Sequence, residues 1–128
     1  MLAIAFGSGS CMSVQIRSQR RDQDAHAAQT VRAIVENQRL YYLQKGRYAA
    51  RLSDLDIPNM QNSNDPQQPV HLRGYCYLLK LSKEGYEVEA WPEIADQSGY
   101  RSFYGDNTGL ITFTLKWRAA GPNDIELD

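Results

Sequence analysis

The chain has 128 residues, of which 42% are hydrophobic and 23% are charged, and its formal net charge is -1. This size and composition are typical of one globular domain with a single core. The near-neutral charge lacks the excess of Lys and Arg with which proteins bind nucleic acid, so no nucleic-acid partner is expected.

Segment 1–21 combines an apolar start with basic residues at its end. The apolar run Met1–Phe6 is shorter than the about 20 residues that a transmembrane helix needs, and no basic residues precede it as in a secretory signal. Cys11 follows small residues, as at a lipoprotein cleavage site, but Ser8 stands where such a site has Leu. The segment is therefore interpreted either as lipidated or as the remnant of a longer membrane helix that continues backwards from Ile16.

A long helix is predicted within Ile16–Tyr48, where the part Asp24–Tyr42 contains neither Gly nor Pro. Apolar residues recur there at intervals of three and four, which places them on one helix face. These residues are Ala27, Ala28, Val31, Ile34, Val35, Tyr41 and Tyr42. The opposite face is charged or polar, so the helix should lie on a sheet with its back in water. Lys45 and Gly46 should end it, because a cation suits the negative end of the dipole and Gly adopts the left-handed conformation.

A short helical turn and a loop are expected after the long helix. The turn lies within Tyr48–Leu55 and should end near Ile57, because Pro58 restricts the residue before it. Segment Asn59–Pro69 is rich in Asn, Gln, Asp and Ser and contains two prolines, Pro66 and Pro69. This composition favours a loop, which we interpret as a surface connection.

Beyond Pro69 the spacing of apolar residues changes from the period of a helix to that of a strand. Two antiparallel pairs of strands are predicted. They are Val70–Leu81 with Tyr86–Ala90, and Tyr100–Tyr104 with Leu110–Leu115. The loops Ser82–Gly85 and Gly105–Gly109 have turn residues within each pair, and segment 91–99 connects the pairs. The polar tail 118–128 should fray.

These elements predict an α+β domain, residues 22–128, in which the long N-terminal helix packs on a four-stranded antiparallel sheet. Its core should combine one helix face with the inward face of the strands. The core residues expected are Val31, Ile34, Val35, Tyr42, Leu78 and Val88. About half of the 8 tyrosines should point into this core, because side chains alternate along a strand.

Five stretches follow one another along residues 16–113: TVRAIVENQRLYY in the helix, then KGRYAARLSDL, GYCYLLKL, GYEVEAWP and SGYRSFYGDNTGLI. This order resembles the type IV pilins and the pseudopilins of type II secretion, in particular the G-type branch. The matching positions are mostly packing and turn positions. They are Ala27, Val31, Arg32, Ile34 and Gln38 in the helix, Gly46, Tyr48, Leu52 and Leu55 after it, and Tyr86, Ala90, Pro92, Arg101, Phe103, Asp106 and Gly109 in the sheet.

The resemblance implies a structural subunit of a bacterial envelope filament or secretion machine, facing the periplasm or the exterior. Its partners would be homologous subunits or other components of the machine. The alternative is a soluble or lipid-anchored periplasmic binding module with the same fold, using the loop at 59–69 or the one at 91–99 as its contact surface.

The start of the chain departs from the family pattern. Pilin-like proteins begin with a prepilin peptidase site, a glutamate at the fifth mature position and a hydrophobic helix of about 20 residues. Residues 1–15 match none of these, so the chain is interpreted as a truncated member or as a soluble derivative. An upstream hydrophobic segment would add the inner membrane as a partner. Without one, the apolar strip is small against the cost of association, and we expect a monomeric or weakly associated chain.

No constellation of catalytic residues is visible, so neither an enzyme nor a cofactor-binding protein is predicted. His26 and His71 lack a second ligand at helical spacing and are interpreted as surface histidines. Cys76 is interpreted as a small buried residue in a strand, and its distance from Cys11 argues against a disulfide or a CxxC site.

Calcium is considered because the resemblance to the G-type branch implies calcium binding in the sheet loops. The candidate ligands are Asp96, Asp106 and Asn107. Three side chains from two loops are too few for an ion that takes about 6–8 oxygen ligands. Asp106 and Asn107 are instead interpreted as turn residues, and no metal site is predicted.

Overall fold

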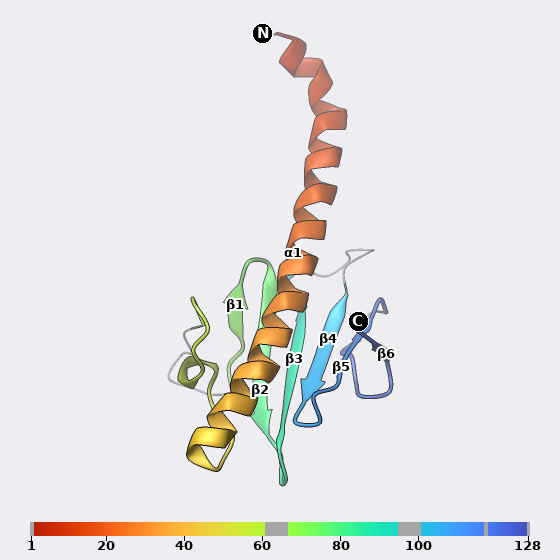
Figure 1. The fold of residues 1–128 in the computed structure, drawn as a ribbon. Coiled ribbons are helices and arrows are strands. Elements are labelled where there is room, and N and C mark those ends of the chain that lie inside the picture. The colour runs from red at the N-terminus through yellow and green to blue at the C-terminus, as the bar shows by residue number, and fades with distance from the viewer. Residues whose placement is uncertain (1, 61–66, 95–100, 117, 128) are drawn as a thin grey trace.

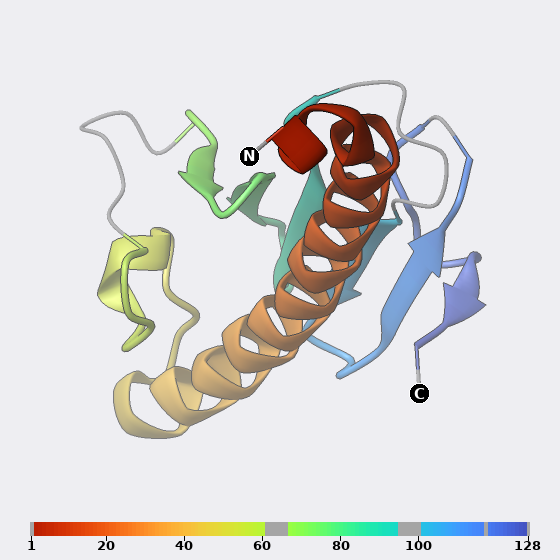
Figure 2. The same cartoon turned by 90° about the horizontal axis from the view of Figure 1, so that it is seen from above.

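The computed structural model describes residues 2–60, 67–94, 101–116 and 118–127, and side chains from residue 19 onward. One helix dominates the molecule: α1 (Leu2–Lys45), which is followed by the short 3-10 helix η1 (Leu52–Asp54). The C-terminal half of α1 packs on a sheet, and its N-terminal half projects beyond the ends of the strands (Figure 1). Seen from above, α1 covers one face of the sheet (Figure 2).

The sheet has six antiparallel strands in the order β1-β2-β3-β4-β5-β6. They are β1 (Val70–Leu72), β2 (Tyr75–Leu81), β3 (Tyr86–Pro92), β4 (Ser102–Asp106), β5 (Ile111–Thr114) and β6 (Ile125–Glu126). The predicted α+β class and the single helix packed on an antiparallel sheet are confirmed. The predicted number of four strands is wrong, for two separate reasons.

First, the predicted strand Val70–Leu81 is two strands joined by a tight turn. Arg73 and Gly74 have φ angles of 48° and 83°, and positive φ at both central residues is typical of the two-residue turn that joins antiparallel strands. The chain therefore reverses inside the apolar run, and His71 pairs with Cys76 across the turn.

Second, the tail predicted to fray returns to the sheet as β6, where Ile125 pairs with Phe113. The turn before β6 is held by Asp124, which accepts hydrogen bonds from the backbone N–H of Gly121 and from the Arg118 guanidinium, both at 2.8 Å. These bonds lower the pKa of the Asp124 carboxyl to about 2, and the bond from Arg118 has the larger effect. The carboxylate therefore stays charged at ordinary pH and keeps both bonds.

The core fills the space between α1 and the inner face of the sheet, the face turned toward the helix. Alternation along the central strands directs three side chains of β2 and three of β3 to this inner face. They are Tyr75, Tyr77 and Leu79, and Tyr86, Val88 and Ala90. Of the predicted core residues, Val31, Ile34 and Val88 are fully buried and Val35 packs against them.

Two predicted core residues, Tyr42 and Leu78, lie outside this core. The Tyr42 side chain is 45% exposed, and it packs on the Tyr48 ring at 4.6 Å between centroids near the end of the helix. Leu78 is only half-buried and stands between Tyr77 and Leu79, which point inward. Because neighbouring strand residues point to opposite faces, Leu78 faces away from α1.

Two polar contacts fix α1 on the sheet and on the segment that follows it. The side chain of Gln38 is fully buried; it donates to the carbonyl of Ala49 at 2.9 Å and accepts from its N–H at 2.8 Å. Asp24 accepts hydrogen bonds from the Arg101 Nε at 2.9 Å and the Arg101 backbone N–H at 3.1 Å. The two contacts mark the ends of the helix face that the domain covers.

Between these contacts, α1 lies close to β4 at Gly105. A Cβ atom built there would lie 2.9 Å from Cγ2 of Val35, 3.2 Å from Cγ1 of Val88 and 3.4 Å from Cγ1 of Val31. These neighbours are branched core side chains with little freedom to move. The absence of a side chain at residue 105 therefore sets how closely the helix can lie on the sheet.

We expect Ile34→Ala to lower the free energy of unfolding by about 2–5 kcal/mol, because it removes buried methyl groups and leaves a cavity. Leu43→Ala is the matched control: the Leu43 side chain is 69% exposed, and its loss should change stability by less than about 0.5 kcal/mol. Denaturant unfolding followed by circular dichroism measures both. Equal midpoints for Ile34→Ala and the parent would show that the buried helix face is assigned wrongly.

Gly105→Ala should destabilise the domain by about 1–3 kcal/mol, because the added methyl group forces Val35 or Val88 to shift. Gly121→Ala is the control, since no atom lies within 4 Å of a Cβ built at residue 121. Calorimetric melting of the two variants compares them directly. A Gly105→Ala protein as stable as the parent would mean that the helix can move away from β4 at no cost.

Candidate functional site

The turn residues considered as calcium ligands are engaged in hydrogen bonds with the neighbouring strands. Asp106 Oδ2 accepts from the Tyr104 hydroxyl at 2.8 Å, and Asn107 Oδ1 accepts from the backbone N–H of Tyr86 at 3.3 Å. Asp106 Oδ1 also accepts from the backbone N–H of Thr108 at 3.0 Å, and Asn107 lies within the turn. The predicted role of both residues in the turn after β4 is confirmed. Asp96, the third residue considered, lies outside the described residues.

Three potential metal ligands meet on the outer face of the sheet, the face turned away from α1. They are His71 of β1, Cys76 of β2 and Glu93, which directly follows β3. Nδ1 of His71 lies 2.5 Å from Oε2 of Glu93 and 3.6 Å from Sγ of Cys76. One ligand atom from each residue lies within 4.8 Å of the other two, and among the described residues no other group of this kind occurs.

The strand register brings these three side chains together. The tight turn after β1 places His71 directly opposite Cys76, and Cys76 pairs on its other side with Trp91. Glu93 stands two residues after Trp91, so alternation returns it to the same face. Its backbone N–H donates to the carbonyl of Gly74 at 2.9 Å, which holds the residue beside the turn. We call these three residues the His71–Cys76–Glu93 cluster.

The cluster is open on one side. The side chains of His71 and Glu93 are 61% and 36% exposed, whereas Cys76 is buried. Burial, and after it the negative charge of Glu93, raises the pKa of the Cys76 thiol. The thiol therefore remains protonated at neutral pH and is a poor nucleophile until its proton is removed.

The cluster does not have the geometry of a catalytic triad. In a triad the two ring nitrogens of the histidine serve different partners, one the nucleophile and the other the orienting carboxylate. Here the same atom, Nδ1 of His71, faces both Cys76 and Glu93. The arrangement instead directs a nitrogen, a sulfur and an oxygen at one another, as metal ligands are directed.

The second histidine, His26, lies in α1 apart from this cluster. It is partly buried, and its Nδ1 lies 3.5 Å from the Thr30 hydroxyl oxygen. Burial, followed by the charge of Arg73, lowers the pKa of His26. The interpretation of His26 as a surface histidine is thus only partly correct, and nothing described near it adds a further metal ligand.

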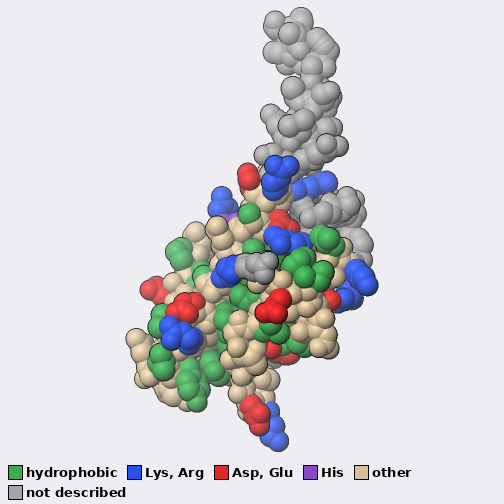
Figure 3. Space-filling view, turned by 45° about the vertical axis from the view of Figure 1, so that its right-hand side comes forward, with side chains coloured by type: hydrophobic (Ala, Val, Ile, Leu, Met, Phe, Trp, Pro, Cys, Tyr) green, Lys and Arg blue, Asp and Glu red, His purple; other side chains and the backbone are tan. Residues whose placement is uncertain are grey.

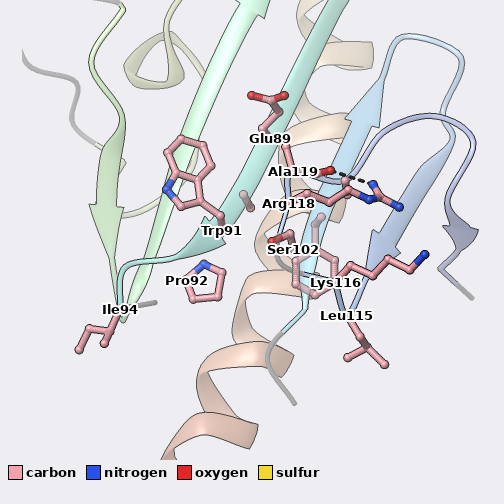
Figure 4. A pocket seen from close by; sticks show the side chains of 12 residues that line it. Glu89, Trp91, Pro92, Ile94, Ser102, Leu115, Lys116, Arg118 and Ala119 are labelled. Atoms are coloured by element: carbon pink, nitrogen blue, oxygen red, sulfur yellow. Dashed lines mark hydrogen bonds between the residues drawn. The ribbon is translucent and has the colours of Figure 1, made fainter. Parts of the chain in front are cut away.

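An apolar hollow of about 230 Å³ opens near the end of β3. Trp91, Pro92 and Ile94 lie on one side of it, and Leu115 and Arg118 lie on the other (Figure 4). The side chains of Ile94 and Leu115 are exposed. The lining is mostly hydrophobic, so the hollow suits an apolar group of a partner better than a charged ligand.

Hydrophobic side chains also gather at the end of the domain where α1 stops, while charges of both signs are scattered over the rest of the visible face (Figure 3). The last turns of α1 carry three exposed hydrophobic residues, Leu40, Tyr42 and Leu43. Together with the hollow, they give the domain two apolar surfaces that a neighbouring molecule can cover.

No family model, curated protein or solved structure matches the chain. Within the described part of the chain, no helix is both long enough and apolar enough to cross a membrane.

Glu93→Gln should speed the alkylation of Cys76 by iodoacetamide at mildly alkaline pH by a few fold. Removing the carboxylate charge lowers the pKa of the thiol and so raises its thiolate fraction, although burial continues to hold the pKa up. Peptide mass spectrometry separates this reaction from that of Cys11. Glu84→Gln, in the exposed β2–β3 loop, is the control and should leave the rate unchanged. Equal alkylation rates for both variants would show that the Glu93 charge does not act on the Cys76 thiol.

Proposed function

We propose that the protein is a pilin-like or pseudopilin-like structural subunit of a bacterial envelope filament or secretion machine. The observation that carries this proposal is the division of α1 into two parts. The part from Asp24 to Gln38 is covered by the sheet and the segment after the helix, and the part before it projects from the domain (Figure 1). A folded head on a projecting helix suits a subunit that packs through its helix.

The length of the projecting part supports this proposal. About 20 residues of α1 precede Asp24, and at about 1.5 Å per residue they extend roughly 30 Å. Isolated helices of this length are marginal in water, because most helical stability in proteins comes from packing. Helices of neighbouring subunits would supply the packing that the head of the same chain does not.

The positions that carry the family resemblance have structural roles in the head. Ala27, Val31 and Ile34 are buried against the sheet. Gly46 and Gly109 have φ angles of 74° and 88°, which favour glycine at the end of the helix and in the β4–β5 turn. These roles agree with a pilin-like head, in which the sequence motif maintains the fold and the subunit contacts lie elsewhere.

The second candidate function is a periplasmic binding module. The apolar hollow beside Trp91 and Leu115 favours it, because such a surface can receive an apolar segment of another protein. In this case α1 would act as a spacer, and the hollow would be the functional surface. The two functions differ in which part of the molecule contacts the partner.

Ser13→Pro separates the two functions. A proline in a helix interior removes a hydrogen bond and costs about 3 kcal/mol or more, and residue 13 lies in the projecting part of α1. We expect the parent and the control Ser13→Ala, expressed from the native gene together with any hydrophobic segment encoded upstream, to cross-link into multimers in the envelope fraction. Ser13→Pro should lose the multimers while the purified head keeps the melting temperature of the parent.

Two results would contradict the filament proposal. One is a Ser13→Pro protein that still forms the multimers of the parent. The other is a parent that cross-links only to unrelated proteins, together with Trp91→Ala and Leu115→Ala variants that no longer cross-link to them. That second result would identify the hollow as the functional surface and the protein as a binding module.

A further inference from the structure

We propose that the His71–Cys76–Glu93 cluster is a binding site for a divalent transition-metal ion, with zinc as the ion that it fits best. This inference is independent of the proposed role in assembly, because it concerns only side chains of the head. It depends on the three ligand atoms that the register of β1, β2 and β3 brings within 4.8 Å of one another.

The spacing of two ligand atoms already matches a zinc site. With bonds of about 2.0–2.1 Å to nitrogen and about 2.3 Å to sulfur, a tetrahedral zinc ion holds these two atoms about 3.6 Å apart. Nδ1 of His71 and Sγ of Cys76 lie 3.6 Å apart. They can therefore bind the ion without a change in the backbone of the β1–β2 turn.

The third ligand must move by a small distance. Oε2 of Glu93 is 2.5 Å from Nδ1 of His71, whereas a tetrahedral zinc ion separates nitrogen and oxygen ligands by about 3.4 Å. A bound metal ion would lie between these two atoms and replace their direct contact. The Glu93 side chain is partly exposed, so a change of its rotamer can move the carboxylate oxygen outward by about 1 Å. Its backbone N–H stays hydrogen-bonded to Gly74.

The types of ligand select the metal. Calcium and magnesium prefer oxygen ligands alone, and copper(I) prefers soft sulfur ligands. Zinc binds imidazole, thiolate and carboxylate ligands alike, and it commonly has four ligands. Three come from the protein, and the open side of the cluster leaves the fourth position to water. Binding releases the proton of the Cys76 thiol, since the thiolate is the form that binds metal.

The site would stiffen the domain at the point where α1 leaves the sheet. The turn between β1 and β2 lies against the helix there, because a Cβ atom at Gly74 would come within 2.7 Å of the Gln23 side chain. A bound ion would tie β1, the edge strand, to β2 and to the end of β3. The melting temperature of the head should therefore rise when zinc is added and fall when a chelator removes it.

The test uses the purified full chain after treatment with a chelator. Isothermal titration with zinc chloride should show one ion per chain, and titration with cobalt(II) should produce the near-ultraviolet charge-transfer band of a thiolate ligand. His71→Ala and Glu93→Gln change exposed side chains and should fold normally. Each should weaken zinc binding about 10-fold or more, the order found when groups at a metal site are removed. Cys76→Ala should abolish the cobalt band.

The controls are His26→Ala and Cys11→Ser, which remove the other histidine and the other cysteine and should leave zinc affinity and the cobalt band unchanged. The proposal is overturned if the parent binds no zinc at micromolar concentration. It is overturned equally if His71→Ala and Glu93→Gln bind zinc like the parent, since the ion would then be held by a single thiol or elsewhere. If Cys11→Ser loses the cobalt band and Cys76→Ala keeps it, the ion is bound at Cys11 and the proposal is overturned.

Discussion

The packing of one face of α1 on the sheet is the constraint on which the rest of the domain depends. Gly105 lets the helix approach the sheet, and two polar contacts fix the two ends of its covered part: Asp24 with Arg101, and Gln38 with Ala49. Each of these polar groups is buried or half-buried, so each would be costly to leave without a partner. The position of the helix along the sheet is thereby set, and with it the length of helix that projects. The assembly proposal depends on this division of the helix.

The chemistry of the head depends on a much smaller feature, the reversal of the chain at Gly74. The tight turn there decides which residue of β1 stands opposite Cys76, and a shift of one residue would turn His71 to the inner face. The hydrogen bond from Glu93 to the same glycine adds the third side chain from a different strand. A local property of the backbone thus brings together three groups that are up to 22 residues apart along the chain.

The sequence predicted those features that neighbouring residues determine. The helix ends at Lys45 and Gly46 follows with positive φ, as the glycine rule requires. The apolar spacing identified Val31 and Ile34 as core residues. The turn inside Val70–Leu81 was missed because a run of apolar residues concealed the reversal, although the Gly within it was a signal.

β6 and the metal-ligand cluster were missed for a different reason. Both require contacts between distant segments, which the spacing of residues along a chain does not report.

The order of the strands has a consequence for how the chain folds. Each strand pairs with its neighbours in sequence, so the sheet can form by successive local hairpins, each of which closes a short loop. The helix is different, because the contact between Asp24 and Arg101 joins residues that are 77 apart along the chain. Closing so long a loop is slow, although its entropic cost is only a little larger than that of a short loop. During synthesis, α1 leaves the ribosome first, well before β3 and β4, the strands on which it packs. Until β4 is complete, its apolar face is exposed, and this interval is when the chain is most open to association with the wrong partner.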